Sequence, residues 1–313
     1  MDSSLKVSSL LGLHHILLIL ALLTGVGVNG HSWVDELTCA SGPFFETDPS
    51  LPPSPGYIRN YVGRQSTEID TLTTFRILDT SSKQPVCAPN TQSPGQLQEF
   101  PQLNATQGDL IKASYLENGH IWQTLAGQNG PKASPGIIYW YGTQNPRSDR
   151  DFASVREWTA DGSGGDGEGF LLAKTDFDDA VCIETGHEDA DPQNPRVGGP
   201  CSSFFRIPEN AEIGKDLTVY WLWDYSEHFG PDPTYTEWYS SCMDIRIFSK
   251  EDARRMVEER AKERANGNAR RDTEHVSADS TPVKGINRHI RRQQLHNERR
   301  NQIGEKKSSW FSW

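Results

Sequence analysis

The sequence predicts a mostly β fold: an immunoglobulin-like antiparallel β-sandwich with long loops, followed by a charged helix and a disordered tail. Two observations predict the sandwich. No sustained helical period occurs before residue 249, and short runs of β-forming residues alternate with turns dense in Gly and Pro. The expected strands are 136–141, 217–224, 241–248 and, with a weaker pattern, 109–115. The turn sequences are 54–56, 94–95, 134–136 and 162–169.

The end of the chain has a different character. Ser249 is a helix-capping residue, and Glu251 and Asp252 follow in what would be the first turn. We expect a charged helix over 249–267, ended by Gly267. Residues 268–313 are rich in Arg, Asn and Gln with almost no core-forming side chains, which predicts a disordered basic tail.

Charge separates the body from the tail. Residues 31–249 hold 14 Lys and Arg against 31 Asp and Glu, a net charge of −17, whereas residues 250–313 hold 16 against 10, a net charge of +6. Because an acidic surface repels phosphates, we expect no nucleic-acid partner for the body. The carboxylates of 161–169 do not have the spacing of an EF-hand loop, and a Gly-rich surface turn is the favoured interpretation there.

The amino terminus predicts secretion. Lys6 precedes an apolar stretch that ends near Leu23, and Val28 and Gly30 occupy the −3 and −1 positions of a cleavage site. The alternative is a transmembrane anchor, for which the apolar run is short. We therefore expect a signal peptide over 1–30, a mature chain that begins with His31, and an extracellular protein with no membrane partner after cleavage.

The cysteines and one sequon agree with that compartment. All five cysteines lie within the body, so four of them can form two disulfides and one is left over. No CxxC spacing is present, which disfavours a metal–thiolate cluster. The mature chain has a single N-glycosylation sequon, Asn104-Ala105-Thr106.

His31 is the residue most suggestive of chemistry. As a mature first residue it offers its α-amine and its ring Nδ1 to one metal, and a second His would complete a planar set of three nitrogens that suits copper(II). The candidates for this second His are His120, His187 and His228. His120 is favoured because it follows a strand-like stretch and a Gly, whereas His187 lies in an acidic, solvated loop.

Three short motifs in the chain together resemble a known protein family. A mature chain opening with His, the Asn-Gly-His segment at 118–120 and the run Glu-Trp-Tyr-Ser-Ser-Cys at 237–242 together look like the lytic polysaccharide monooxygenases. The opening at 31–34 and the run at 55–64 also resemble a large set of fungal secreted proteins related to that superfamily, over roughly residues 31–248.

The resemblance implies roles for particular residues. Fungal cellulose-active members enter the last strand through Gln-x-Tyr-x-x-Cys, so Tyr239 would be the axial copper ligand and Glu237 would stand in place of the Gln, near the oxygen site. By the same analogy Cys242 pairs with Cys87. We further expect Cys182 to pair with Cys201 and Cys39 to be free.

The function that these expectations favour is copper-dependent oxidative cleavage of a polysaccharide. Glu237 and Tyr239 would be catalytic, and His31, His120 and Tyr239 would be the metal ligands within a copper-binding domain over 31–248. Two alternatives stay open: a copper-binding protein without oxidative activity, and a metal-free secreted recognition module. The tryptophans Trp33, Trp122 and Trp238 would stack on sugars or simply pack in the core. No pattern in the sequence names the polysaccharide or an oligomeric state.

Overall fold

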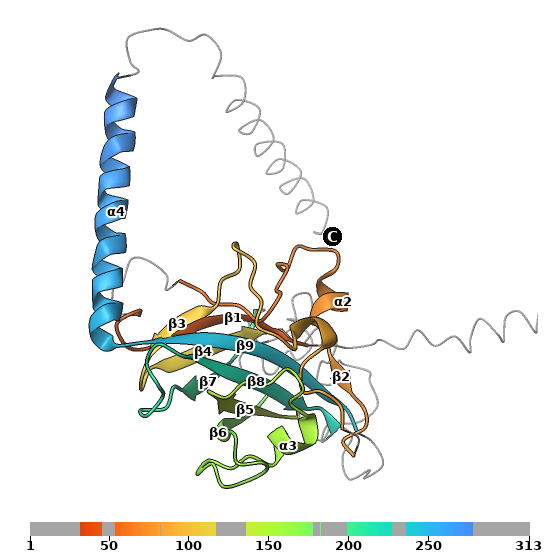
Figure 1. Cartoon of the computed structure of the whole chain (residues 1–313). Helices are drawn as coiled ribbons and strands as arrows, with labels where there is room; N and C mark the ends of the chain where they lie inside the picture. Colours follow the sequence, from red (N-terminus) through yellow and green to blue (C-terminus); the bar gives the residue numbers. More distant parts are fainter. Residues whose placement is uncertain are drawn as a thin grey trace, which may run out of the picture. The chain divides into compact units, whose positions relative to one another are not determined.

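The computed structural model is mostly β and contains two β-sheets (Figure 1). It describes residues 32–45, 54–81, 83–116, 136–177, 182, 199–226 and 236–277, with side chains up to residue 264. The expected signal peptide lies outside the described residues. The two sheets confirm the predicted β-sandwich.

The smaller sheet has three antiparallel strands in the order β1-β4-β7. These strands are β1 (Val34–Cys39), β4 (Leu110–Tyr115) and β7 (Cys201–Arg206). Buried and more exposed side chains alternate along β4 and β7. This pattern is expected of a sheet that covers a core with one face and meets solvent with the other.

The larger sheet has the order β2-β9-β8-β5-β6. Its strands are β2 (Arg76–Ile77), β9 (Trp238–Phe248), β8 (Asp216–Asp224), β5 (Ile137–Thr143) and β6 (Phe170–Asp176). A sixth strand, β3 (Leu103–Thr106), pairs with β9 in parallel. All the other strand pairs of the two sheets are antiparallel, as predicted.

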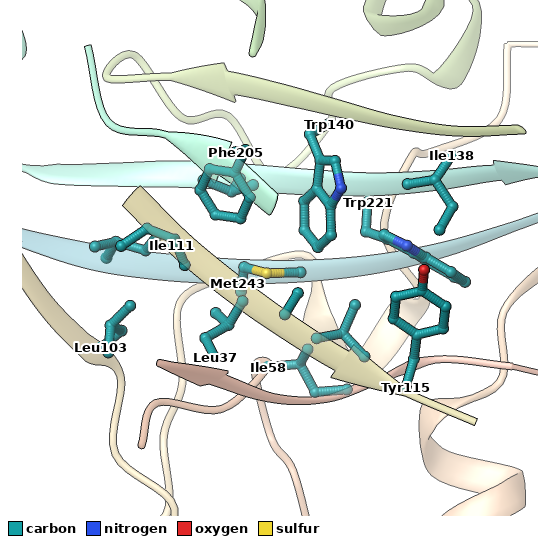
Figure 2. Packing of buried hydrophobic residues seen from close by; sticks show 14 of the residues in the cluster. Leu37, Ile58, Leu103, Ile111, Tyr115, Ile138, Trp140, Phe205, Trp221 and Met243 are labelled. Carbon is teal, nitrogen blue, oxygen red and sulfur yellow. The ribbon is translucent and has the colours of Figure 1, made fainter. Parts of the chain in front are cut away.

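The main core lies between the two sheets. Figure 2 shows Trp140, Trp221 and Met243 of the larger sheet packed among side chains of β1 and β4, including Leu37, Ile111 and Tyr115. A second buried cluster lies on the other face of the larger sheet and contains Phe152 and Val155 of the short helix α3 (Phe152–Arg156). With both faces covered, β8 and β9 are buried along almost their whole length.

Helix α4 (Lys250–Ser277) begins where the sequence predicts. Ser249 Oγ accepts a hydrogen bond of 3.0 Å from the backbone amide of Asp252, which confirms the cap. The expected end at Gly267 is wrong, because the helix continues for ten residues and includes 268–277, which were expected to be disordered. A glycine inside a helix costs only about 1 kcal/mol relative to alanine, so strong helix formers on both sides outweigh it. Residues 278–313 of the predicted tail lie outside the described residues.

The chain divides into two units, 1–257 and 258–313. Within the first unit, the start of α4 is held by Ala253, which is fully buried, and by Met256 and Val257, which pack against the main core. No described helix is long and apolar enough to cross a membrane.

Both expected disulfides are present. Cys87 is bonded to Cys242, which ties the segment before the short 3-10 helix η1 (Pro89–Thr91) to β9, and Cys182 is bonded to Cys201 at the start of β7. Cys39 is free and buried, as expected. Burial, followed by the nearby carboxylate of Asp109, raises the pKa of the Cys39 thiol to about 12. This thiol is therefore a packed core group rather than a nucleophile.

Candidate metal centre

The chain immediately after His31 is fixed at one end of the sandwich. Ser32 and Trp33 are both buried, and Val34 begins β1. The backbone amide of Val34 donates a hydrogen bond of 3.2 Å to Ser241 Oγ on β9. The first residue of β1, in the smaller sheet, is therefore joined directly to β9 of the larger sheet.

The same segment also contacts the end of β4. Ser32 Oγ donates a hydrogen bond of 2.7 Å to the carbonyl oxygen of Leu116, and Val34 is the register partner of Tyr115. Leu116 is the last described residue before the segment that contains His120. His31 and His120 themselves lie outside the described residues, as do His187 and His228. Ser32, which follows His31, and Leu116, four residues before His120, are therefore in direct contact.

Tyr239 and Glu237 lie near this junction, at the start of β9. Side chains two apart on a strand share a face, so Tyr239 and Ser241 point to the same side of the larger sheet. Tyr239 is fully buried and Glu237 is 4% exposed. The Tyr239 hydroxyl donates a short hydrogen bond to Glu237 Oε1. The run at 237–242 thus places these two side chains together.

Arg76 is a member of this group that the sequence did not reveal. It is the register partner of Tyr239 on β2, and its Nη1 lies 3.9 Å from Glu237 Oε1. The Arg76 side chain is 41% exposed while the Glu237 side chain is almost buried, so the cation lies at the solvent side of the carboxylate. β2 has only two residues, too few to be detected from a sequence pattern.

The Tyr239 ring is held by a stack of aromatic side chains. Its ring centroid lies 5.4 Å from that of Trp223 on β8, which in turn stacks on Phe177 at 3.8 Å. Tyr115 Oη donates a hydrogen bond of 2.7 Å to the backbone carbonyl of Phe177. Because these rings are buried between the sheets, the position of the Tyr239 hydroxyl is fixed by packing.

The tryptophans near the sequence motifs serve as packing groups where the structure describes them. Trp33 is 1% exposed, and Trp238 is 6% exposed and packs beside Tyr139 and Phe152. Neither presents a free face for a sugar, so core packing is the correct interpretation for both. Trp122 lies outside the described residues.

The glycine-rich segment 161–169 is a surface turn, as the sequence favoured. The Asp161 carboxylate accepts hydrogen bonds from Thr159 and from Ser163, and these bonds lower the pKa of the fully exposed Asp161 to about 2. Within the part of the chain that the structure describes, no group of three or more His, Cys, Asp or Glu side chains is placed to hold a metal ion. The two histidines expected at copper are not in that part.

The fold and this constellation define a mostly β, disulfide-bonded protein with a fixed amino-terminal segment. A family model matches residues 28–276, so the chain belongs to the family described as "Domain of unknown function (DUF7492)". No curated protein matches the chain in sequence.

Several solved structures are distantly similar. A cellulose-active polysaccharide monooxygenase from M. thermophila matches with a TM-score of 0.34 and 17% identity, over 70% of this chain and 78% of that chain. The glycoside hydrolase family 61 member Cel61B from Hypocrea jecorina matches with a TM-score of 0.34 and 12% identity, over 70% and 82% of the two chains. A CBM33 polysaccharide monooxygenase matches with a TM-score of 0.30 and 12% identity, over 67% and 99%.

Proposed function

We propose that this protein is a secreted copper protein that oxidatively cleaves a polysaccharide. In this proposal His31, through its amino group and ring, and His120 would hold copper together with the hydroxyl of Tyr239. The observation that carries the proposal is the Ser32–Leu116 hydrogen bond at 2.7 Å, which joins the residue after His31 to a residue four positions before His120. The backbone next to His31 thus lies beside the backbone that leads toward His120.

Tyr239 fits the role of a copper ligand chemically. Its hydroxyl donates a hydrogen bond to Glu237 Oε1, and a phenol oxygen is also an acceptor, which is the property a metal ligand needs. Two imidazoles and an amine are donors that copper(II) prefers. Bound copper would supply one-electron and dioxygen chemistry, which the protein side chains alone lack.

Glu237 and Arg76 are the charged side chains beside the Tyr239 hydroxyl. Glu237 Oε1 accepts the hydrogen bond from the Tyr239 hydroxyl, and Arg76 places a positive charge 3.9 Å from the same oxygen. A carboxylate at this position can accept or return a proton during an oxidation next to a glycosidic oxygen. Two disulfides support the extracellular location, because such bonds persist in oxidising compartments.

The test is product analysis on the correctly processed protein. Copper-loaded protein is incubated with a reductant, hydrogen peroxide and a panel of polysaccharides, and the soluble products are analysed by mass spectrometry. We expect oxidised oligosaccharides from at least one polysaccharide, and none when copper or the reductant is omitted.

Two other outcomes would each replace this proposal. Tight copper binding with no oxidised product from any polysaccharide would identify a copper-binding protein without oxidative activity. Absence of copper binding would leave a metal-free recognition module as the function.

A further inference from the structure

Asp35 is the centre of a polar cluster beside the amino-terminal segment. Its Oδ1 accepts hydrogen bonds of 3.0 Å from Trp33 Nε1 and 3.0 Å from Tyr61 Oη, and its Oδ2 accepts a short hydrogen bond from Arg64. The Arg64 guanidinium also lies over the Trp33 ring, 4.6 Å from its centroid. We call Trp33, Asp35, Tyr61 and Arg64 the Asp35 cluster. In this cluster Asp35 binds the N–H at the edge of the Trp33 indole, and Arg64 covers the face of the same ring.

A β-bulge directs the Asp35 side chain into this cluster. Val34 is paired with Tyr115 and Glu36 with Ser114, so Asp35 is an extra residue in β1. A bulge of this kind turns a side chain away from the ordinary alternation of the strand. The chain departs from regular pairing at the residue that makes the three hydrogen bonds.

Tyr61 and Arg64 come from a segment that is anchored independently. In that segment Arg59 forms a buried ion pair with Asp244 on β9. The Tyr61 ring stacks on Tyr57 at 5.2 Å and packs edge-on against Phe100 at 5.1 Å. The run at 55–64, which the proposed function leaves unexplained, is therefore a rigid platform for the amino-terminal segment.

We infer that Asp35 is a positioning residue for the mature amino terminus, and this inference rests on the proposed function. A chain end frays unless it is tied down, and a terminal amine can hold a metal well only if the residues behind it are fixed. Through Trp33, the Asp35 cluster fixes the chain two residues after His31. The Ser32–Leu116 and Val34–Ser241 hydrogen bonds then complete the placement.

The chain offers a matched control for Asp35. Asp166 accepts a hydrogen bond of 2.7 Å from Trp158 Nε1 and a short one from Arg150, whose guanidinium lies 5.3 Å from the Trp158 ring centroid. This Asp–Trp–Arg arrangement has the same chemistry as the Asp35 cluster but lies in the loop after α3. Asp166→Asn therefore removes comparable interactions without touching the amino-terminal segment.

The experiment compares Asp35→Asn with Asp166→Asn in two measurements on the processed protein. In the metal-free protein, we expect Asp35→Asn to speed amide hydrogen exchange in the peptide containing residues 32–34 by about 10-fold, because charge-assisted hydrogen bonds are lost. We expect its copper(II) Kd to rise by about 10-fold, the lower end of the range for lost supporting groups around a metal. Asp166→Asn is expected to change neither quantity.

Each outcome decides the inference. Equal exchange in the two variants would overturn it, as would an unchanged copper Kd in Asp35→Asn when the wild type binds copper. If the wild type binds no copper, the proposed function fails, while the exchange result still shows whether Asp35 fixes the segment. Should Asp35→Asn fail to fold, Tyr61→Phe, which keeps the ring and removes one of the three hydrogen bonds, is measured against the same control.

Discussion

Replacing His120 by Ala is expected to weaken copper(II) binding by more than about 100-fold. Loss of a group that merely supports a metal ligand costs about 10- to 100-fold in affinity, so loss of a ligand should cost more. The expectation rests on the contact between Ser32 and Leu116, which brings the segments leading to His31 and His120 together. Isothermal titration of the processed variant with copper(II), against wild type, measures the change.

The other two candidate histidines are the controls. His187→Ala and His228→Ala are expected to bind copper with a Kd within about 3-fold of wild type, because neither is expected to be a ligand. Loss of binding in one of these variants, with binding retained in His120→Ala, would show that the second ligand had been assigned to the wrong histidine.

Asp244→Asn is expected to lower the free energy of unfolding by about 3–5 kcal/mol, the usual cost of leaving a buried charge without its partner. Asp244 and Arg59 are almost inaccessible to solvent, with exposed side-chain fractions of 1% and 2%. Both carboxylate oxygens accept hydrogen bonds of 2.7 Å from the guanidinium, and Thr218 Oγ1 donates a third. The variant would leave the Arg59 charge buried with only neutral partners. Urea unfolding followed by tryptophan fluorescence measures the loss.

A second ion pair, between Arg246 on β9 and Asp216 on β8, provides the control. Arg246 and Asp216 lie 2.7 Å apart but are 39% and 28% exposed, so Asp216→Asn is expected to cost less than about 1 kcal/mol. The double variant Arg59→Met/Asp244→Leu should lose less than Asp244→Asn, because it leaves no unpaired charge in the core. A cost below about 1 kcal/mol for Asp244→Asn would contradict the structural role given to the pair.

The central strands could be predicted from the sequence because their signal is local. All four predicted strands are present as β4, β5, β8 and β9, with β9 beginning three residues earlier than expected. β8 and β9 are rich in aromatic and β-branched residues because both of their faces are buried. Runs of this kind stand out without any knowledge of what they pair with.

The edge elements were missed for the opposite reason. β2 has two residues and β3 has four, and β3 is held by parallel pairing to a strand some 140 positions later. The helices α2 (Ile69–Thr73) and α3 have five residues each, too few to show a helical period. These elements form because the rest of the fold supplies their partners.

In the candidate site too, some residues could be predicted from the sequence and others could not. Glu237 and Tyr239 were indicated by the family resemblance of the run at 237–242, and the structure shows the hydrogen bond between them. Arg76 and Asp35 could not, since each acts through a partner brought close by strand pairing or by a bulge. The cleavage site and the local sequence that indicated His31 and His120 carry no information about such supporting residues.

The measurement that tests the central claim most directly is a copper(II) titration followed by electron paramagnetic resonance. It compares processed protein beginning at His31 with a form that keeps one extra residue before it, which removes the free α-amine of His31 but leaves every described contact in place. We predict a tight one-to-one signal with nitrogen couplings in the processed form and its loss in the extended form. Identical signals and affinities in the two forms would contradict the claim, because copper would then bind without the amino terminus of His31.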